Sequence, residues 1–275
     1  MRVRYIVVQR ILFLALLLGP FLVDGTALAG EVPRFSGALV DVTDPITLRY
    51  RSVDHFQMDM MISAIANGSS DKTAHIAMIV EGSVKPLGSD LQWLMDFWMS
   101  VNSLDPKGSG DPVSVTMESN ELGKVLRVEL SGRNPLDGKP LRPGTPEYIQ
   151  MSSDMISYAR PMPREPITQG SDIYRSISKD ELLAQFKVPP NVSADIDVKG
   201  IVQGLAVIND HTCVVVQQMG DIRMTAKGQT MTATISGYVA YDTTTALPID
   251  GRIITDVKSS DGRLTMDLLV HASLQ

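Results

Sequence analysis

Alternation of apolar and polar residues is the feature of this sequence that most restricts its fold. One side of the extended stretch HFQMDMMISA carries Phe56, Met58, Met60, Ile62 and Ala64. The stretches KVLRVELS, DIRMTAKGQTMTATISGYVAY and GRLTMDLLV repeat the pattern. A period of two predicts strands with one buried face. The dipeptides Asn67-Gly68, Lys227-Gly228 and Asp261-Gly262 separate such runs and predict antiparallel hairpins.

One apolar stretch fits two patterns. In LQWLMDFWMSV, residues 91–101, the residues that fit one face of a helix are Leu91, Leu94, Met95 and Trp98. We predict a strand, because strand-like runs lie on both sides of this stretch.

Two short helices are expected outside the strands. Thr145-Pro146-Glu147 has the order of an N-cap, a proline at the first helical position and an acid in the first turn, and predicts a helix to about Ala159. Ser178 and Glu181 form a capping box for a second helix, which Pro189-Pro190 would end.

The first residues have the composition of a secretory signal peptide. Arg2, Arg4 and Arg10 precede the apolar run ILFLALLL, and the small residues Ala27 and Ala29 follow with the spacing of a cleavage site. We expect cleavage near Ala29 and a periplasmic or secreted protein. The apolar run is short for a membrane span, so no transmembrane segment is expected after cleavage.

The cysteine content restricts the possible disulfides, and the net charge restricts the possible binding partners. Cys213 is the single cysteine, so no intrachain disulfide can form, and we expect it to be a small buried residue on a strand. The formal net charge is −6, with acidic residues scattered along the chain. Such a charge opposes nucleic acid as a primary partner.

The two halves of the sequence show the same order of features. In each, an apolar strand leads to an Asp (Asp105, Asp242), a polar loop, a Pro (Pro112, Pro248) and further strands. This repeated order predicts an internal duplication. The expected organisation is a signal peptide (1–29), an N-terminal segment (30–43), a first β-rich half (44–132), a Pro-rich connection with a short helix (133–165) and a second β-rich half (166–275).

The stretch YDTTTALPI, residues 241–249, could be either a reactive loop or only a corner where the chain turns. We interpret it as a corner, in which Asp242 bonds the backbone two residues on and Pro248 begins the next strand. The stretch resembles a turn of the exported bacterial lipid carriers LolA, LprG and LppX. That resemblance implies a strongly curved antiparallel sheet with helices on its concave face and acyl chains held between them. With the alternation it predicts a mainly β fold: a curved-sheet meander in two similar halves, with two short helices.

The sequence lacks the standard spacings of a zinc site and of a serine nucleophile elbow. The four histidines are far apart, and neither His-Glu-x-x-His nor Gly-x-Ser-x-Gly occurs. A copper(I) site in HFQMDMM would need His55 and Met61 beside Met58 and Met60, which have the opposite parity on a strand. We therefore expect no enzyme, no catalytic residues, no metal and no cofactor.

Methionine is the residue that points to a function. The chain has 15 methionines against 6 phenylalanines and 2 tryptophans. Flexible thioether side chains suit either an ordinary core or a cavity for apolar ligands. The residues predicted to line such a cavity are Met58, Met60, Met224, Met231 and Met266. We expect an exported protein that binds an apolar or amphipathic ligand such as a lipid; the alternative is a structural or protein-interaction module of the cell envelope.

Overall fold

A computed structural model describes residues 32–67, 72–135, 137–156, 160–177, 193–226, 229–259 and 262–275. The expected signal peptide and the expected helix after Ser178 lie outside these residues.

Ten strands dominate the described chain, as the alternation predicted. They are β1 (Val53–Asn67), β2 (Lys72–Leu87), β3 (Asp90–Val101), β4 (Val113–Ser119), β5 (Val125–Ser131), β6 (Ser193–Ile208), β7 (His211–Ala226), β8 (Gln229–Asp242), β9 (Pro248–Ser259) and β10 (Gly262–Leu274). A single-turn 3-10 helix, η1 (Lys107–Ser109), precedes β4, and one α-helix, α2 (Pro146–Ile156), follows β5. The ambiguous stretch 91–101 is a strand, because it belongs to β3.

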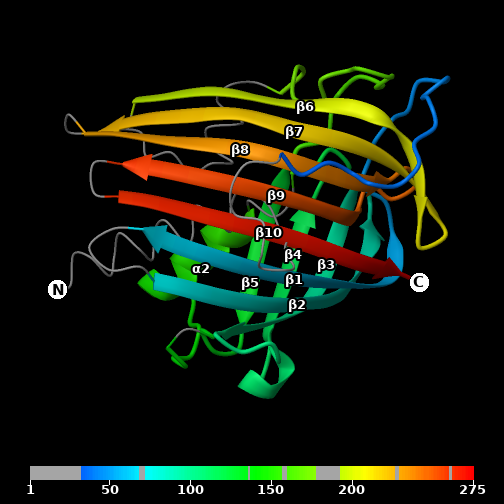
Figure 1. The fold of residues 1–275 in the computed structure, drawn as a ribbon. Helices are drawn as coiled ribbons and strands as arrows, with labels where there is room; N and C mark the ends of the chain where they lie inside the picture. The colour runs from blue at the N-terminus through cyan, green and yellow to red at the C-terminus, as the bar shows by residue number, and fades with distance from the viewer. Residues whose placement is uncertain are drawn as a thin grey trace.

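All ten strands form one antiparallel sheet in the order β5-β4-β3-β2-β1-β10-β9-β8-β7-β6. Each half of the chain is a five-stranded meander, and the pairing of β1 with β10 joins the two, from Phe56 opposite Leu274 to Asn67 opposite Arg263. Figure 1 shows the strong curvature: β6 to β10, β1 and β2 cross the front, and β3 to β5 turn behind them beside α2. The mainly β, antiparallel, curved meander predicted from the sequence is therefore confirmed.

The alternation decides which side chains enter the core. On β3, Leu91, Trp93, Phe97 and Met99 are buried, while the residues between them are more exposed. Helix α2 adds Met151 and Met155 to the same core. The concave face is thus filled from the sheet on one side and from α2 on the other.

The helix begins as predicted. The Thr145 hydroxyl accepts a hydrogen bond from the Tyr148 backbone N–H at 3.3 Å, which satisfies one of the free donors of the first turn. The Tyr148 hydroxyl in turn lies 3.3 Å from the Leu130 backbone nitrogen, which fixes the helix against β5.

The stretch YDTTTALPI is a corner between β8 and β9. Asp242 is buried, and its carboxylate accepts hydrogen bonds from the Thr245 N–H and hydroxyl, both at 2.7 Å. The bond therefore spans three residues, not the two expected, since Ala246 takes a left-handed conformation and its N–H bonds the Asp242 carbonyl. Pro248 begins β9 as predicted.

A second, smaller core lies on the convex face. There the N-terminal segment crosses β6 to β8 (Figure 1): Phe35 packs edge-on against Tyr238, and Gln217 donates to the Pro33 carbonyl. Cys213 is fully buried in this core, as expected. Burial raises the pKa of the Cys213 thiol to about 12, so the group stays protonated and unreactive.

The segment 160–177 crosses the concave face and is held at both ends. The Met162 N–H bonds the Leu122 carbonyl in the β4–β5 turn, and the Ile173 N–H bonds the Gly200 carbonyl of β6. Gly123 makes the first contact possible. A Cβ at this position would lie 2.2 Å from the Arg160 carbonyl oxygen, and the residue has a φ of +82°.

Replacing Gly123 by alanine should therefore destabilise the protein more than the same change at Gly88. Gly88 also has a positive φ but no atoms within 4 Å of a new Cβ. Gly88→Ala should cost only the left-handed backbone, about 1–2 kcal/mol, and Gly123→Ala roughly 1–3 kcal/mol more through overpacking. Urea unfolding of the two variants measures the difference, and equal losses would contradict this account.

The stability of the sheet should also depend on pH through His271. Its Nδ1 lies 2.9 Å from Asp250 Oδ1 across β9 and β10, and this hydrogen bond raises the pKa of His271. The raised pKa means that the contribution is fully present below about pH 6.5 and is lost as pH rises through the folded-state pKa.

His271→Gln should accordingly lower the free energy of unfolding more at about pH 5.5 than at about pH 8.5, by under roughly 1 kcal/mol because the pair is half-exposed. Denaturant titrations at both pH values measure this. An equal effect at both would show that the pair does not couple to folding.

Candidate ligand cavity

A small apolar cavity of about 80 Å³ lies on the concave face of the sheet. It is lined by Tyr50, Phe56, Met58, Met60, Val80, Trp93, Met95, Phe97, Val115, Met117, Met155, Leu247 and Pro248. Strands β1 to β4 form one wall, and α2 and the β8–β9 corner close the others.

The strand register explains how distant residues meet in this wall. Met58 lies opposite Val80, and Val80 lies opposite Phe97 on the next strand. Trp93 and Met95 continue the same surface onto β4, where they pair with Met117 and Val115. Each of these residues occupies an inward position of its strand, so the period of two builds one continuous apolar surface.

The polar atoms at this wall already have partners within the protein. The Trp93 indole N–H donates to the Ser119 hydroxyl at 2.9 Å, and both residues are buried. The Tyr50 ring packs edge-on against Trp93, with centroids 5.1 Å apart. Burial raises the pKa of the Tyr50 phenol above its usual value, so the group stays neutral. The wall therefore favours apolar atoms over water.

The structure places two of the five methionines predicted from the sequence at the cavity and the other three elsewhere. Met58 and Met60 line the cavity together, with Met58 half-buried and Met60 almost fully buried. Met224 and Met266 are buried elsewhere in the same core, and Met231 lies half-buried opposite Met224 across β7 and β8. The cavity lies among β1 to β4, to which those three do not belong.

Sequence reasoning missed most of the lining. Phe56 lies on the same strand face as Met58 and Met60, and the alternation could have included it. Trp93, Met95 and Phe97 alternate in β3 in the same way. Met155 and Tyr50 carried no such signal, because they reach the cavity from a helix and from the segment before β1.

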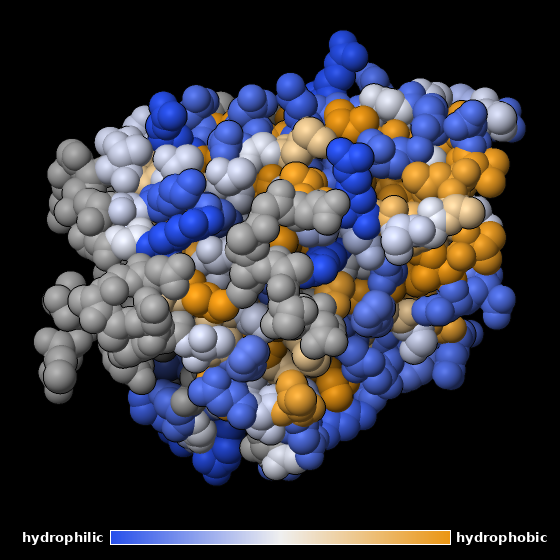
Figure 2. All heavy atoms as spheres, in the orientation of Figure 1, coloured by the Kyte–Doolittle hydropathy of each residue, from blue (hydrophilic) through white to orange (hydrophobic). Residues whose placement is uncertain are grey.

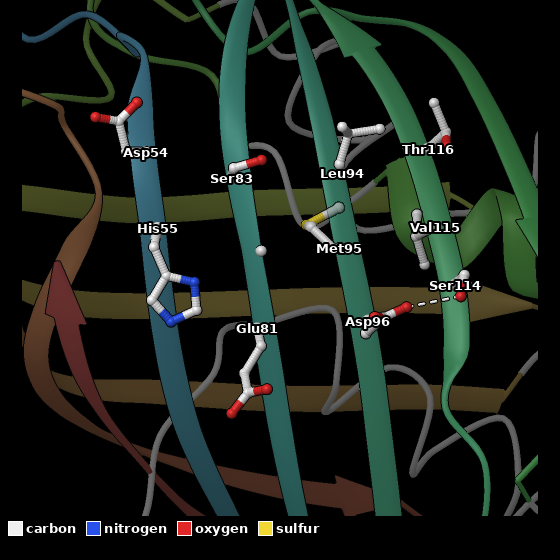
Figure 3. Close-up of a pocket in the computed structure, with 11 residues that line it drawn as sticks. Asp54, His55, Glu81, Ser83, Leu94, Met95, Asp96, Ser114, Val115 and Thr116 are labelled. Carbon is white, nitrogen blue, oxygen red and sulfur yellow. Dashed lines mark hydrogen bonds between the residues drawn. The ribbon is translucent and has the colours of Figure 1, made fainter. Parts of the chain in front are cut away.

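A second hollow, of about 430 Å³, lies on the opposite face of β1 to β4 and is open and polar. Figure 3 shows Asp54, His55, Glu81 and Asp96 along it, with the Ser114 hydroxyl donating to Asp96 at 2.6 Å. His55 is therefore on the other side of the strand from Met58 and Met60, as their parity predicted. Within the described ranges, no three His, Cys, Asp or Glu side chains gather closely enough to hold a metal ion.

Comparisons with known proteins find little. No protein-family model matches the sequence, and no curated protein matches it. Among solved structures, DynF from the dynemicin biosynthesis pathway of Micromonospora chersina matches 92% of this chain and 94% of its own, at 8% identity and a TM-score of 0.22. A score of this size supports no inference about this chain. Within the described residues, no helix has the length and apolar character needed to cross a membrane.

Both methionines line the cavity but differ in burial, so shortening them should have unequal costs. Met60→Ala removes a fully packed side chain and should cost about 2–5 kcal/mol. Met58→Ala should cost less than about half of that, since its side chain is only partly surrounded by protein. Met219→Ala, at a position 43% exposed on β7, should change stability by under about 0.5 kcal/mol. Denaturant unfolding of the three variants measures this order, and an equal cost for Met58 and Met60 would contradict it.

Proposed function

We propose that this protein is exported to the cell envelope and binds an apolar or amphipathic ligand, such as a lipid, in the cavity of the concave face. The observation that carries the proposal is the continuous inward wall of Met58, Met60, Trp93, Met95 and Phe97, which surrounds a volume left unfilled by the core. Protein interiors are close-packed, so an apolar void among flexible side chains suits a ligand better than it suits an ordinary core.

Five methionines in the lining make the cavity adaptable. The resting volume of about 80 Å³ equals only roughly three water molecules, so an acyl chain requires the walls to move. Met58, Met95 and Met155 have unbranched side chains that can take new rotamers at small cost. Met155 belongs to α2, and a shift of this helix from the sheet would lengthen the cavity.

Export is proposed from the sequence of the first 29 residues, whose basic, apolar and small-residue regions follow in the order of a signal peptide. An envelope location agrees with a carrier of apolar molecules, which need protection from water between membranes. The resemblance of the β8–β9 corner to that of exported lipid carriers supports the same proposal.

An apolar surface patch favours the alternative, a protein-interaction module. Val40 pairs with Leu205 beside the β6–β7 turn, and Leu39, Val40 and Val207 are 41%, 68% and 74% exposed. Figure 2 shows hydrophobic residues gathered toward the right of the visible face, among hydrophilic ones. Exposed apolar residues in such a cluster mark contact sites for proteins.

Met58→Asp is the variant that tests the cavity. A carboxylate in the apolar wall should abolish ligand retention, because the ligand would have to bury that charge without a partner. The matched control is Met219→Asp on the outer face of β7, where Lys199 lies opposite and can pair with the new charge. Native mass spectrometry and solvent extraction of each purified protein measure what remains bound.

We expect a co-purifying apolar mass with the unaltered protein and with Met219→Asp, and none with Met58→Asp at an unchanged circular dichroism spectrum. A ligand-free unaltered protein that also takes up no fluorescent fatty acid would overturn the carrier function. It would favour the interaction module, for which capture experiments with Val207→Asp provide the next test.

A further inference from the structure

A buried cluster of polar residues adjoins the apolar cavity. Its centre is Arg160, in the segment that crosses the concave face, and the side chains around it are Tyr50, Tyr174, Gln218 and Tyr241. All five residues are at least nine-tenths buried. They come from four separate parts of the chain, so the fold rather than the local sequence assembles them.

Arg160 contacts hydroxyl and amide oxygen atoms of the cluster. Arg160 Nη1 lies 3.3 Å from the Tyr174 hydroxyl and 3.5 Å from Gln218 Oε1, and the guanidinium also bonds the Tyr241 hydroxyl. Burial raises the pKa of Tyr174 above its usual value, so this phenol stays neutral beside the charge. A guanidinium in such surroundings is a strong donor toward an anion, because little water screens it.

Gln218 supplies the observation that points to a ligand. Its side chain is 2% exposed, and its Nε2 donor has no hydrogen-bond partner among the described residues. The same amide contacts Arg160 through Oε1, so the free donor belongs to the cluster. A buried amide N–H without an acceptor costs free energy, and an oxygen atom of a bound anion would remove that cost.

The cluster and the cavity share Tyr50. Its ring lines the cavity and packs on Trp93, while its phenol accepts a hydrogen bond from the backbone of Arg160. A second link runs through the β8–β9 corner, because Tyr241 pairs with Pro248, which lines the cavity. Tyr50 and the β8–β9 corner therefore place the cluster next to the cavity.

We infer that the ligand is an anionic amphiphile of the fatty-acid class, whose apolar chain occupies the cavity while its carboxylate is bound by Arg160 and Gln218. This inference rests on the proposed function and names its ligand class. A carboxylate matches the planar donor fork of arginine, and its second oxygen can accept from Gln218 Nε2. A neutral amphiphile would leave that donor without an acceptor of comparable strength.

The test compares ligands that share one apolar chain and differ in the polar group at its end. Dodecanoate and dodecanol share the apolar chain, acetate has the carboxylate alone, and inorganic phosphate is an anion without a chain. Isothermal titration calorimetry of the delipidated full-length protein measures the affinity for each ligand. We expect dodecanoate to bind roughly tenfold to a hundredfold more tightly than dodecanol, and neither small anion to compete with it.

Two variants locate the anion. Arg160→Met keeps the length of the side chain and removes its charge, and it should reduce the affinity for dodecanoate roughly tenfold to a hundredfold while changing that for dodecanol by under about twofold. Gln218→Glu places a competing carboxylate beside Arg160 and should have the same selective effect. If Arg160→Met does not fold, Gln218→Glu decides the question.

Each result separates this inference from the function on which it rests. Equal affinity for dodecanoate and dodecanol, or variants that weaken both alike, would overturn the anionic ligand and leave the apolar cavity standing. Acetate or phosphate that displaces dodecanoate would show an anion site unrelated to the chain and would also overturn it. No binding of either amphiphile would overturn the proposed function itself.

Discussion

The pairing of β1 with β10 is the interaction on which the rest of the structure depends. It joins strands that are far apart in the sequence, and it converts two five-stranded meanders into one sheet of ten. Because strands twist, a sheet of this width curves strongly, and the inward faces of its strands surround a common core. The same register aligns Met58 and Met60 with the inward residues of β2 and β10. Without this pairing, neither half would enclose its apolar face.

Curvature alone does not fill the concave side, and the described residues between 133 and 177 complete it. Helix α2 brings Met151 and Met155 onto the sheet, and the crossing segment brings Arg160 and Tyr174. A side chain as polar as arginine is costly to bury even when it is hydrogen-bonded. The close approach of Arg160 to Gly123 shows how firmly the β4–β5 turn sets its position. The polar cluster is therefore a fixed part of the fold and not a chance contact of a loop.

Local patterns in the sequence predicted the elements, and long-range contacts decided the site. The period of two is a property of neighbouring residues, so the strands, the hairpins and the strand at 91–101 were predictable. The cap at Thr145 and the corner at Pro248 are equally local. Alternation identifies the inward face but not the place along the sheet, which is why Met224, Met231 and Met266 were grouped with Met58 and Met60. Arg160 stands in the proline-rich stretch YARPMPREP, which has no period, and its partners lie at positions 50, 174, 218 and 241.

The two hollows of the sheet illustrate why volume is a poor guide to binding. The outer one is about five times larger, but it is open to solvent. Asp54, Glu81 and Asp96 add charge to its lining, so water competes there for hydrogen bonds. The inner one is small, but burying apolar surface in it yields about 25 cal/mol per Å². Water gains little from a wall of thioethers and aromatic rings, and the side chains of that wall can move. The proposed ligand would displace Met58 or Met155 and exchange one apolar contact for another, so on this proposal the small resting volume would slow entry more than it would weaken binding.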